Sequence, residues 1–471
     1  MKKFTDGFFS IDSVNGFLPL KEPLLTLPYN YNHLQKLIDE MPIKKPNGKP
    51  GLLSAENQFE KFALLLPNYL NKIKSENDVF LLAALFRAYS FISSAYTLSA
   101  SYHTFLKTGQ YGKAKNLLPK NIAQPFVEVA KKLDVYPWLD YHYAYSLGNY
   151  NKIDKNKGFE WRNLNMAAKF SGLNDERGFI MLHVDINQYS PDLIKAVYGI
   201  TNENSSKQNL SASIKLMGNT LKKMNTRRKL MWKASRWKNY NDFRVFIMGI
   251  KGNEDIFPNG LIYQGVWDEP QFFRGQTGAQ DNIIPTADIA SGVIHYYPEN
   301  QLTNYLMDLR KYRPKCVQLF FKELANSMSK KPILEQLVLS KNQKGMRNLM
   351  RVYEEIYNFR NGHWQFVQKY IMTNTKYAKA TGGTPIISWI PNQIKSVLNY
   401  IEFILNELSQ MEKDFDDEQN LIFSNSLNTY KSKKKLLDKQ LIIVSDSNYN
   451  PGKVFELNKK FKLEDSDIEK K

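Results

Sequence analysis

The amino-acid sequence predicts a mostly α-helical protein. Apolar residues recur at helical spacing over many long segments, whereas the alternation typical of strands is rare and no internal repeat is present. The composition, 42% hydrophobic and 24% charged, is that of an ordinary globular protein and excludes a wholly disordered chain. A length of 471 residues indicates about two or three domains.

Helices are expected wherever the apolar spacing persists. In chain order they are predicted at residues 30–41, 56–74, 77–106, 122–134, 162–171, 190–199, 206–232, 300–326, 345–373, 390–413 and 417–440. Proline and glycine are densest in two other stretches. We predict a surface loop at 43–51 and a long functional loop at 252–292, because structureless loops of that length are otherwise uncommon.

The most hydrophobic stretch, 79–86, predicts a buried helix rather than a membrane span, since Arg87 interrupts it and serine and tyrosine recur beyond it. No signal-peptide core follows the basic N-terminus. A soluble, cytoplasmic protein without a membrane partner is expected. The single cysteine, Cys316, excludes an internal disulfide framework, a multi-cysteine zinc site and a four-cysteine iron–sulfur cluster.

Composition shifts indicate where domains begin and end. The segment 149–158 is polar and lysine-rich, and the chain beyond about residue 430 is strongly charged. We predict a small N-terminal helical domain at 1–155, a larger helical domain at 156–430 and a charged, partly ordered extension at 431–471.

The formal net charge of +19 raises the possibility of a nucleic-acid partner. Residues 204–241 contain no acidic side chain, and Trp232 and Trp237 lie among their lysines and arginines. The alternative, which we prefer, is a solvated helix face whose apolar side chains point inward. Those side chains are Leu216, Leu221, Met224, Leu230 and Met231. No zinc finger, RNA-binding sheet signature or KH loop is present.

Among six histidines, His363 stands out. On a helix it shares a face with apolar residues, the usual setting of a buried core histidine. Two neighbouring residues favour a role as a cofactor ligand instead. Gly362 removes bulk beside His363, as close approach of a flat macrocycle requires, and Arg360 lies one turn earlier, within reach of an anionic ring substituent. A lone histidine is insufficient for zinc but sufficient as the proximal ligand of a heme.

Two glycine motifs are weak signals by themselves. FRGQTGAQD at 273–281 is no Walker loop, because no Gly-Lys-Ser/Thr follows, and TGGTP at 381–385 is a turn whose amides and hydroxyls can hold a carboxylate. An ordinary loop is the alternative for each.

Together these segments resemble the indoleamine 2,3-dioxygenase family of heme enzymes. The resemblance covers about residues 4–400 in family order. Its segments are NLLPKNIAQP (116–125), KKL (131–133), GLIYQGVW (260–267), the 273–281 loop, VLSK (338–341), His363 with KYI (369–371), and TGGT (381–384).

The resemblance implies an all-α fold whose small N-terminal domain packs on a larger domain that binds heme b. It implies cleavage of the indole C2–C3 bond of L-tryptophan with O2 to give N-formylkynurenine, and a reductant for ferric heme. It assigns the iron ligand to His363, and heme contacts to Arg360, Asp288, Thr277 and Gly278. It assigns substrate contacts to Phe179, Arg244, Tyr240, Thr381, Gly278, Tyr145 and Ser146, with Phe179, His183 and Arg244 taking part in catalysis.

Two positions depart from the family pattern. His183 stands where the family usually has serine, and Asn239, with Tyr240 beside it, stands where an aromatic residue is usual. A distal histidine is typical of the related tryptophan 2,3-dioxygenases, where it faces the indole N–H. Two alternatives therefore stay open: a heme-dependent oxygenase or rearrangement enzyme acting on another tryptophan-derived indole, and a non-enzymatic, basic nucleic-acid-binding helical protein.

Overall fold

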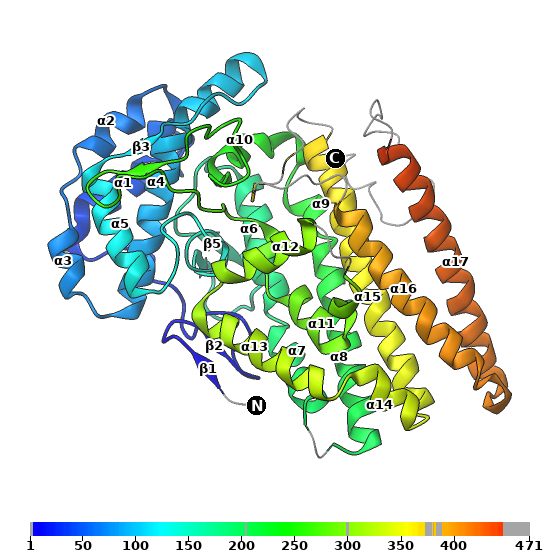
Figure 1. The fold of residues 1–471 in the computed structure, drawn as a ribbon. Helices are drawn as coiled ribbons and strands as arrows, with labels where there is room; N and C mark the ends of the chain where they lie inside the picture. Colours follow the sequence, from blue (N-terminus) through cyan, green and yellow to red (C-terminus); the bar gives the residue numbers. More distant parts are fainter. Residues whose placement is uncertain are drawn as a thin grey trace.

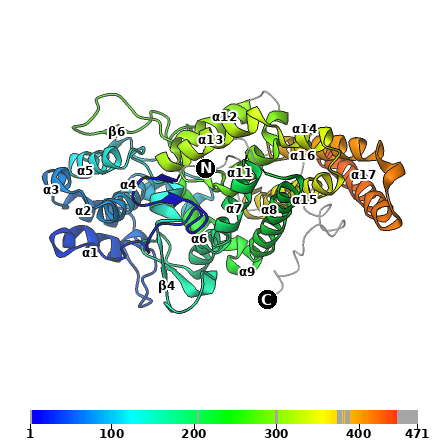
Figure 2. The same ribbon diagram turned by 90° about the horizontal axis from the view of Figure 1, so that it is seen from below.

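The structure is a computed structural model that describes residues 3–202, 205–297, 301–372, 379, 381–382 and 389–445. Helices dominate it, and the strands within these ranges form three two-stranded sheets (Figure 1). The predicted all-α fold class is confirmed. The helices gather into two lobes, with α1–α5 on one side and α6–α17 on the other (Figure 2).

The N-terminal lobe is built around one long buried helix, α4 (Val79–Thr108). Asp78 caps its start by accepting a hydrogen bond from the Phe80 N–H at 2.9 Å, and Gly109 ends it in the left-handed conformation at φ 73°. Packed against α4 or its neighbours are α1 (Asn32–Glu40), α2 (Gln58–Leu64), α3 (Leu70–Ser75) and α5 (Lys120–Lys132). Among the described helices only α4 is long and apolar enough to cross a membrane, and 83% of its apolar window is buried inside the protein.

The larger lobe is organised by α15 (Gln343–Val367), which packs on α8 (Lys207–Arg228) and α16 (Trp389–Ser409) and continues into the π-turn η10 (Gln368–Met372). Around these lie α6 (Asn174–Asn187), α7 (Ser190–Ile200), α9 (Met231–Ala234), α10 (Asn241–Arg244), α11 (Ile283–Ser291), α12 (Gln301–Leu309), α13 (Lys315–Lys330), α14 (Ile333–Leu339) and α17 (Asp417–Ser445).

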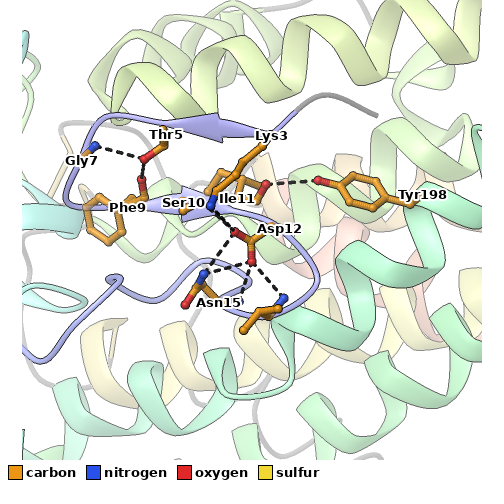
Figure 3. Close-up of polar contacts among 10 residues, drawn as sticks. Lys3, Thr5, Gly7, Phe9, Ser10, Ile11, Asp12, Asn15 and Tyr198 are labelled. Carbon is orange, nitrogen blue, oxygen red and sulfur yellow. Dashed lines mark hydrogen bonds and ion pairs between the residues drawn. The ribbon is translucent and has the colours of Figure 1, made fainter.

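The N-terminal hairpin anchors the start of the chain to the larger lobe. Strands β1 (Phe4–Thr5) and β2 (Ser10–Ile11) pair antiparallel, and Tyr198 of α7 donates a hydrogen bond to the Ile11 carbonyl at 3.1 Å (Figure 3). Asp12 then closes the following turn through the backbone N–H groups of Val14 and Asn15 (Figure 3). Of the other sheets, β3 (Leu117–Leu118) pairs with β6 (Ile262–Tyr263) and β4 (Tyr150–Lys152) with β5 (Leu164–Met166).

Most predicted helices are confirmed, but the helix at 162–171 is wrong. Leu164 and Met166 are buried while Asn165 between them is less so, and this short alternation forms β5 against β4. The predicted 252–292 loop ends in helix α11, whose Pro285 sits in the first turn where a missing N–H costs nothing. The helix predicted at 300–326 is interrupted at Pro314, between η9 (Arg310–Tyr312) and α13.

The C-terminal part of the chain is helical further than expected. Helix α17 continues to residue 445 and packs on α16, so the first part of the predicted extension is helical. Residues 446–471 lie outside the described residues. The division into domains at 155 and 430 stays a prediction.

Candidate active site

A cavity of about 290 Å³ opens within the larger lobe. Its walls come from α6, α8, η10, α15, the loop before α11 and the turn at η9, and most of its lining is aromatic or aliphatic. His183 and His363 both line it. Such a largely apolar cavity with a few convergent polar groups is the usual form of a small-molecule or cofactor site.

His363 is the accessible histidine of α15. Its ring keeps an exposed surface that faces the cavity. Desolvation, followed by the positive charge of Arg228, lowers its pKa to about 4, so the ring is neutral at neutral pH. Within the described ranges no residue hydrogen-bonds to this ring, and no cluster of three or more metal-ligating side chains exists. A neutral, accessible imidazole alone suits a metal whose other ligands come from a cofactor.

Gly362 makes room for the side chain of Arg228, rather than for the flat macrocycle expected from the sequence. A Cβ at this position would lie 2.0 Å from Nη1 of Arg228, so the glycine makes room for a guanidinium against α15. Arg228 is 3% exposed and lies over the rings of Phe359 and Phe366, at 5.8 and 5.3 Å from their centroids. The structure therefore places a buried cation beside the His363 backbone.

Arg360 and Asp288, both predicted to contact heme, form a buried ion pair at the cavity. Arg360 Nη2 lies 2.6 Å from Asp288 Oδ2, and the Tyr297 hydroxyl bonds to both side chains. Burial alone would lower the pKa of Arg360, but the Asp288 charge raises it, so the guanidinium is charged. Arg360 Nε and Asp288 Oδ1 have no hydrogen-bond partner among the described residues. The pair therefore retains unused hydrogen-bonding capacity.

The two glycine motifs meet beside this pair. The Thr381 hydroxyl donates to the Gln276 carbonyl at 2.7 Å, and the Gly249 N–H donates to the Thr381 carbonyl at 2.8 Å. A Cβ on Gly275 would lie 2.3 Å from the Gly249 nitrogen, so only glycine permits this approach of two backbones. Thr277, Gly278 and Thr381 thereby line one cavity. Residues 383–385 of the second motif lie outside the described residues.

His183 and Phe179 lie one turn apart on α6 and both line the cavity. The Nδ1 of His183 lies 3.0 Å from the Phe179 carbonyl oxygen, which can only accept, so Nδ1 carries the proton. The other nitrogen, Nε2, is then an acceptor, and a Cβ added to Gly278 would lie 3.8 Å from it. Burial lowers the pKa of His183 and keeps the ring neutral.

Tyr240, not Asn239, supplies the aromatic side chain. The Asn239 amide donates to Asp175 Oδ2 at 2.9 Å, away from the cavity lining. Tyr240 lines the cavity, and its ring centroid lies 5.0 Å from that of Phe179. The departure at position 239 therefore does not remove an aromatic wall.

Three predicted substrate residues lie outside the cavity lining. Arg244 is fully buried, and its guanidinium donates to the Tyr111 hydroxyl at 3.1 Å and to the Lys379 carbonyl at 2.6 Å. Tyr145 and Ser146 are also fully buried, and the Tyr145 ring packs on Phe170 at 6.0 Å. Their contacts with a substrate stay predictions.

Other cavity residues escaped sequence reasoning. They include Arg228, Tyr297, Tyr305, Arg310 and Arg313. For Arg228 the signal was present but misassigned, because the basic stretch was interpreted as a solvated face. Its lysines are exposed, as expected, whereas Arg227 pairs with Asp185 at 2.6 Å and Arg228 is buried.

The residues present fit a heme. The cavity is mainly apolar, as a porphyrin face requires, and His363 offers an unengaged nitrogen within it. The unused hydrogen-bonding atoms of Arg360 suit an anionic ring substituent.

Comparison with known proteins agrees with this geometry. The family model described as indoleamine 2,3-dioxygenase matches residues 6–421. The chain belongs to the indoleamine 2,3-dioxygenase family. Members of this family are heme-dependent dioxygenases that act on indoleamines, so the protein is an oxidoreductase. Membership decides against the non-enzymatic nucleic-acid-binding alternative.

The similar proteins are distant in sequence. Rat (Rattus norvegicus) indoleamine 2,3-dioxygenase 1 is 26% identical over 410 residues, which cover 81% of this chain and 92% of the relative. Human (Homo sapiens) indoleamine 2,3-dioxygenase 2 is 27% identical over 325 residues, which cover 62% and 75%. A myoglobin of Haliotis madaka is 29% identical over 138 residues, which cover 29% of this chain and 35% of the relative.

Proposed function

We propose that this indoleamine 2,3-dioxygenase family member cleaves the indole C2–C3 bond of L-tryptophan with O2 and gives N-formylkynurenine. The proposal includes heme b as the cofactor, O2 as co-substrate, a reductant that returns ferric heme to the ferrous state, and a cytoplasmic setting without a membrane or nucleic-acid partner. Relatives named indoleamine 2,3-dioxygenase support it, and the similarity to a protein named myoglobin is in keeping with heme binding.

One observation carries the proposal: a single cavity brings together an accessible histidine, an aromatic wall and an acceptor nitrogen. His363 is accessible there, Phe179 and Tyr240 pack together on its lining, and His183 Nε2 is unprotonated. A flat ring with one N–H suits these features, because the aromatic side chains can contact its face and Nε2 can accept its proton in a hydrogen bond.

The roles we propose follow from the side chains. His363 would hold the heme iron, and Arg360 with Asp288, Thr277 and Gly278 would contact the heme and its propionates. When bound, heme supplies the activation of O2. Phe179 and Tyr240 would orient the indole, and His183 would accept its N–H. These groups bind and orient the substrate, so no catalytic carboxylate pair is needed.

The amino-acid end of the substrate is the less direct part of the proposal. Thr381 lines the cavity and presents a hydroxyl that now donates to Gln276. Arg244 lies behind Tyr240, whose pKa it lowers through its charge while burial raises that pKa to about 12 overall. A guanidinium holds a carboxylate bidentately, which is why we keep Arg244 as the carboxylate partner. Tyr145 and Ser146 stay in the proposal as substrate residues.

Isotope labelling tests the reaction. Reduced, heme-loaded protein supplied with L-tryptophan and ¹⁸O₂ is expected to place both labelled atoms in one product molecule, measured by mass spectrometry. A single labelled atom would make the protein a monooxygenase, and no turnover of L-tryptophan would assign it to another indole.

Substitution of Arg244 tests the carboxylate contact. Arg244→Ala is expected to lower kcat/KM for L-tryptophan about tenfold to a hundredfold, because a charge-assisted contact is worth roughly 1.5–3 kcal/mol. Turnover of indole, which has no carboxylate, serves as the control and should change far less. Equal losses on both substrates would show that Arg244 acts through the fold.

A second candidate is an oxygenase or rearrangement enzyme acting on a different tryptophan-derived indole. The acceptor nitrogen of His183, at a position where the family usually has serine, favours it. A panel of indoles in the labelling experiment distinguishes the two.

A further inference from the structure

Asp281 is a cavity-lining carboxylate to which neither the heme nor the substrate roles above assign a task. It lies three residues after Gly278, at the end of the 273–281 loop. Its Oδ1 accepts the Ile283 N–H at 2.8 Å at the start of α11, and its Oδ2 accepts two side-chain hydrogen bonds. Those two bonds join Asp281 to Tyr141 and Asn187.

Both donors on Oδ2 belong to the surroundings of His183. The Tyr141 hydroxyl donates at 2.6 Å, and the Tyr141 ring contacts the His183 ring edge-on, with centroids 5.7 Å apart. The Asn187 amide donates at 2.8 Å and also donates to the backbone carbonyl of His183 at 2.9 Å. One carboxylate oxygen therefore fixes both the ring wall beside His183 and the helix turn that carries it.

The orientation of the His183 imidazole is also restricted by Phe179, which lies on the same helix α6. Nδ1 is held by the Phe179 carbonyl, and the Phe179 ring packs on the imidazole at 5.7 Å. Tyr141 lies against the same imidazole and is held by Asp281. With both contacts in place, Nε2 keeps one direction near Gly278.

We propose that Asp281 is a positioning residue for His183: through Tyr141 and Asn187 it holds the imidazole so that Nε2 accepts the indole N–H of the substrate. The proposal rests on the proposed function in requiring an indole substrate. It predicts that the preference for an indole with a free N–H over its N-methyl form depends on Asp281.

Asp281 acts on His183 through its hydrogen bonds and also through its charge, which raises the pKa of His183 against the larger lowering by burial. Tyr141→Phe keeps that charge and therefore tests the hydrogen bonds alone. The carboxylate of Asp281 does not bond to the imidazole, whose Nδ1 is taken by Phe179. Replacing Asp281 by Asn removes a negative charge and leaves one amide oxygen for three donors, so at least one of Tyr141, Asn187 and the Ile283 N–H loses its partner.

The test compares substrate preference in matched variants. L-Tryptophan and 1-methyl-L-tryptophan are titrated into heme-loaded protein, with the Soret shift giving Kd, and their kcat/KM values are measured separately. Asp281→Asn is expected to lower the preference for the free N–H about twofold to fivefold, which is part of the value of one hydrogen bond. Tyr141→Phe, which keeps the ring and removes only the hydroxyl, should lower it in the same direction.

The decisive variant combines Asp281→Asn with His183→Ser. If Asp281 acts through His183, its substitution changes the preference no further once His183 is absent. An equal change in that background, or no change from either Asp281→Asn or Tyr141→Phe alone, would overturn the proposal.

Asp185→Asn is the matched control. Asp185 is a buried carboxylate two residues after His183 on α6. It forms an ion pair with Arg227 at 2.6 Å and lies outside the cavity lining. Its loss should reduce stability without changing the preference. Indole and 1-methylindole are titrated in parallel, so the network is tested even if L-tryptophan fails to bind, an outcome that would count against the proposed function alone.

Discussion

At the scale of single residues, two neutral histidines in one cavity differ in what their nitrogens do. His183 donates from Nδ1 to the Phe179 carbonyl, so its Nε2 is an acceptor. His363 has no hydrogen-bond partner among the described residues. A ring without partners orients poorly by itself and gains a fixed role only from a ligand. This contrast supports our proposal that His363 holds the heme iron and that His183 contacts the substrate.

The first prediction follows for His363. His363→Ala is expected to lose stoichiometric heme while the fold is kept, because the ring makes no hydrogen bond and faces a cavity. The change in unfolding free energy of the apoprotein should stay within about 1 kcal/mol. The Soret absorbance per chain and the far-UV circular dichroism measure the two effects. Full heme retention with an unchanged spectrum would refute the assignment.

The second prediction concerns His183. His183→Ser should lower the preference for L-tryptophan over 1-methyl-L-tryptophan by up to about tenfold, since one neutral hydrogen bond contributes roughly 0.5–1.5 kcal/mol. Heme content should be unchanged. Identical kinetics on both substrates would place His183 among structural residues of the core.

Sequence reasoning at this scale found residues that lie within motifs and missed those that fold into the site from elsewhere. His363, Arg360, Thr277, Gly278 and Thr381 sit in short recognisable segments, and all line the cavity. Arg228 and Arg313 reach it from the basic stretch and from the turn before α13, where sequence spacing carries no information about contact. Asp281 ends the 273–281 motif, but the motif assigned it no role.

At the scale of elements, the site depends on close backbone contacts between loops. The segment at Gly249 and the loop at Gly275 touch through backbone atoms, and Thr381 hydrogen-bonds to both. Arg313 supports the same loop from behind, donating to the Ala279 carbonyl at 2.9 Å and to Asn282 Oδ1 at 3.1 Å. A side chain at Gly275 would separate these layers.

The third prediction tests that contact. Gly275→Ala is expected to destabilise the protein by about 1–3 kcal/mol and to weaken heme binding, because its Cβ meets backbone atoms that cannot turn aside. Urea denaturation and heme titration measure both effects. Gly158→Ala, where an added Cβ has no neighbour within 4 Å, is the control and should stay within about 0.5 kcal/mol.

Element boundaries show what periodicity can and cannot decide. Long amphipathic helices such as α15 and α16 were predicted well, since many turns repeat the same apolar stripe. Residues 162–171 are too short for such a repeat, and pairing with Tyr150–Lys152 made a strand of Leu164–Met166. Helix α6, which carries His183, was not predicted as a helix, because it is buried on several sides and its apolar stripe is weak.

At the scale of the whole molecule, the π-turn η3 (Tyr141–Tyr145) joins the two lobes. It packs on α4 of the N-terminal lobe, and His142 within it bonds through Nε2 to Asn282 Oδ1 of the larger lobe at 3.1 Å. His142 is fully buried, and its Nδ1 has no partner within the described ranges. Desolvation, followed by the charge of Arg313, lowers its pKa to about 3.

This burial gives the fourth prediction, an acid sensitivity of the joined lobes. The folded pKa of His142 lies below the unfolded value of 6.5, so the unfolded chain binds more protons as the pH falls below 6.5, and stability is lost over the window from about 6.5 down to 3. At pH 5 the loss amounts to roughly 2 kcal/mol relative to pH 8. Other buried groups titrate too: burial raises the pKa of Asp140 to about 7, which works in the opposite direction.

Comparison of the wild type with His142→Gln cancels the contributions of these other groups. Urea denaturation at equal heme content should therefore show the wild type losing about 2 kcal/mol more than the variant between pH 8 and pH 5. Parallel pH profiles would mean that His142 is protonated in the folded protein or that the junction between the lobes admits water.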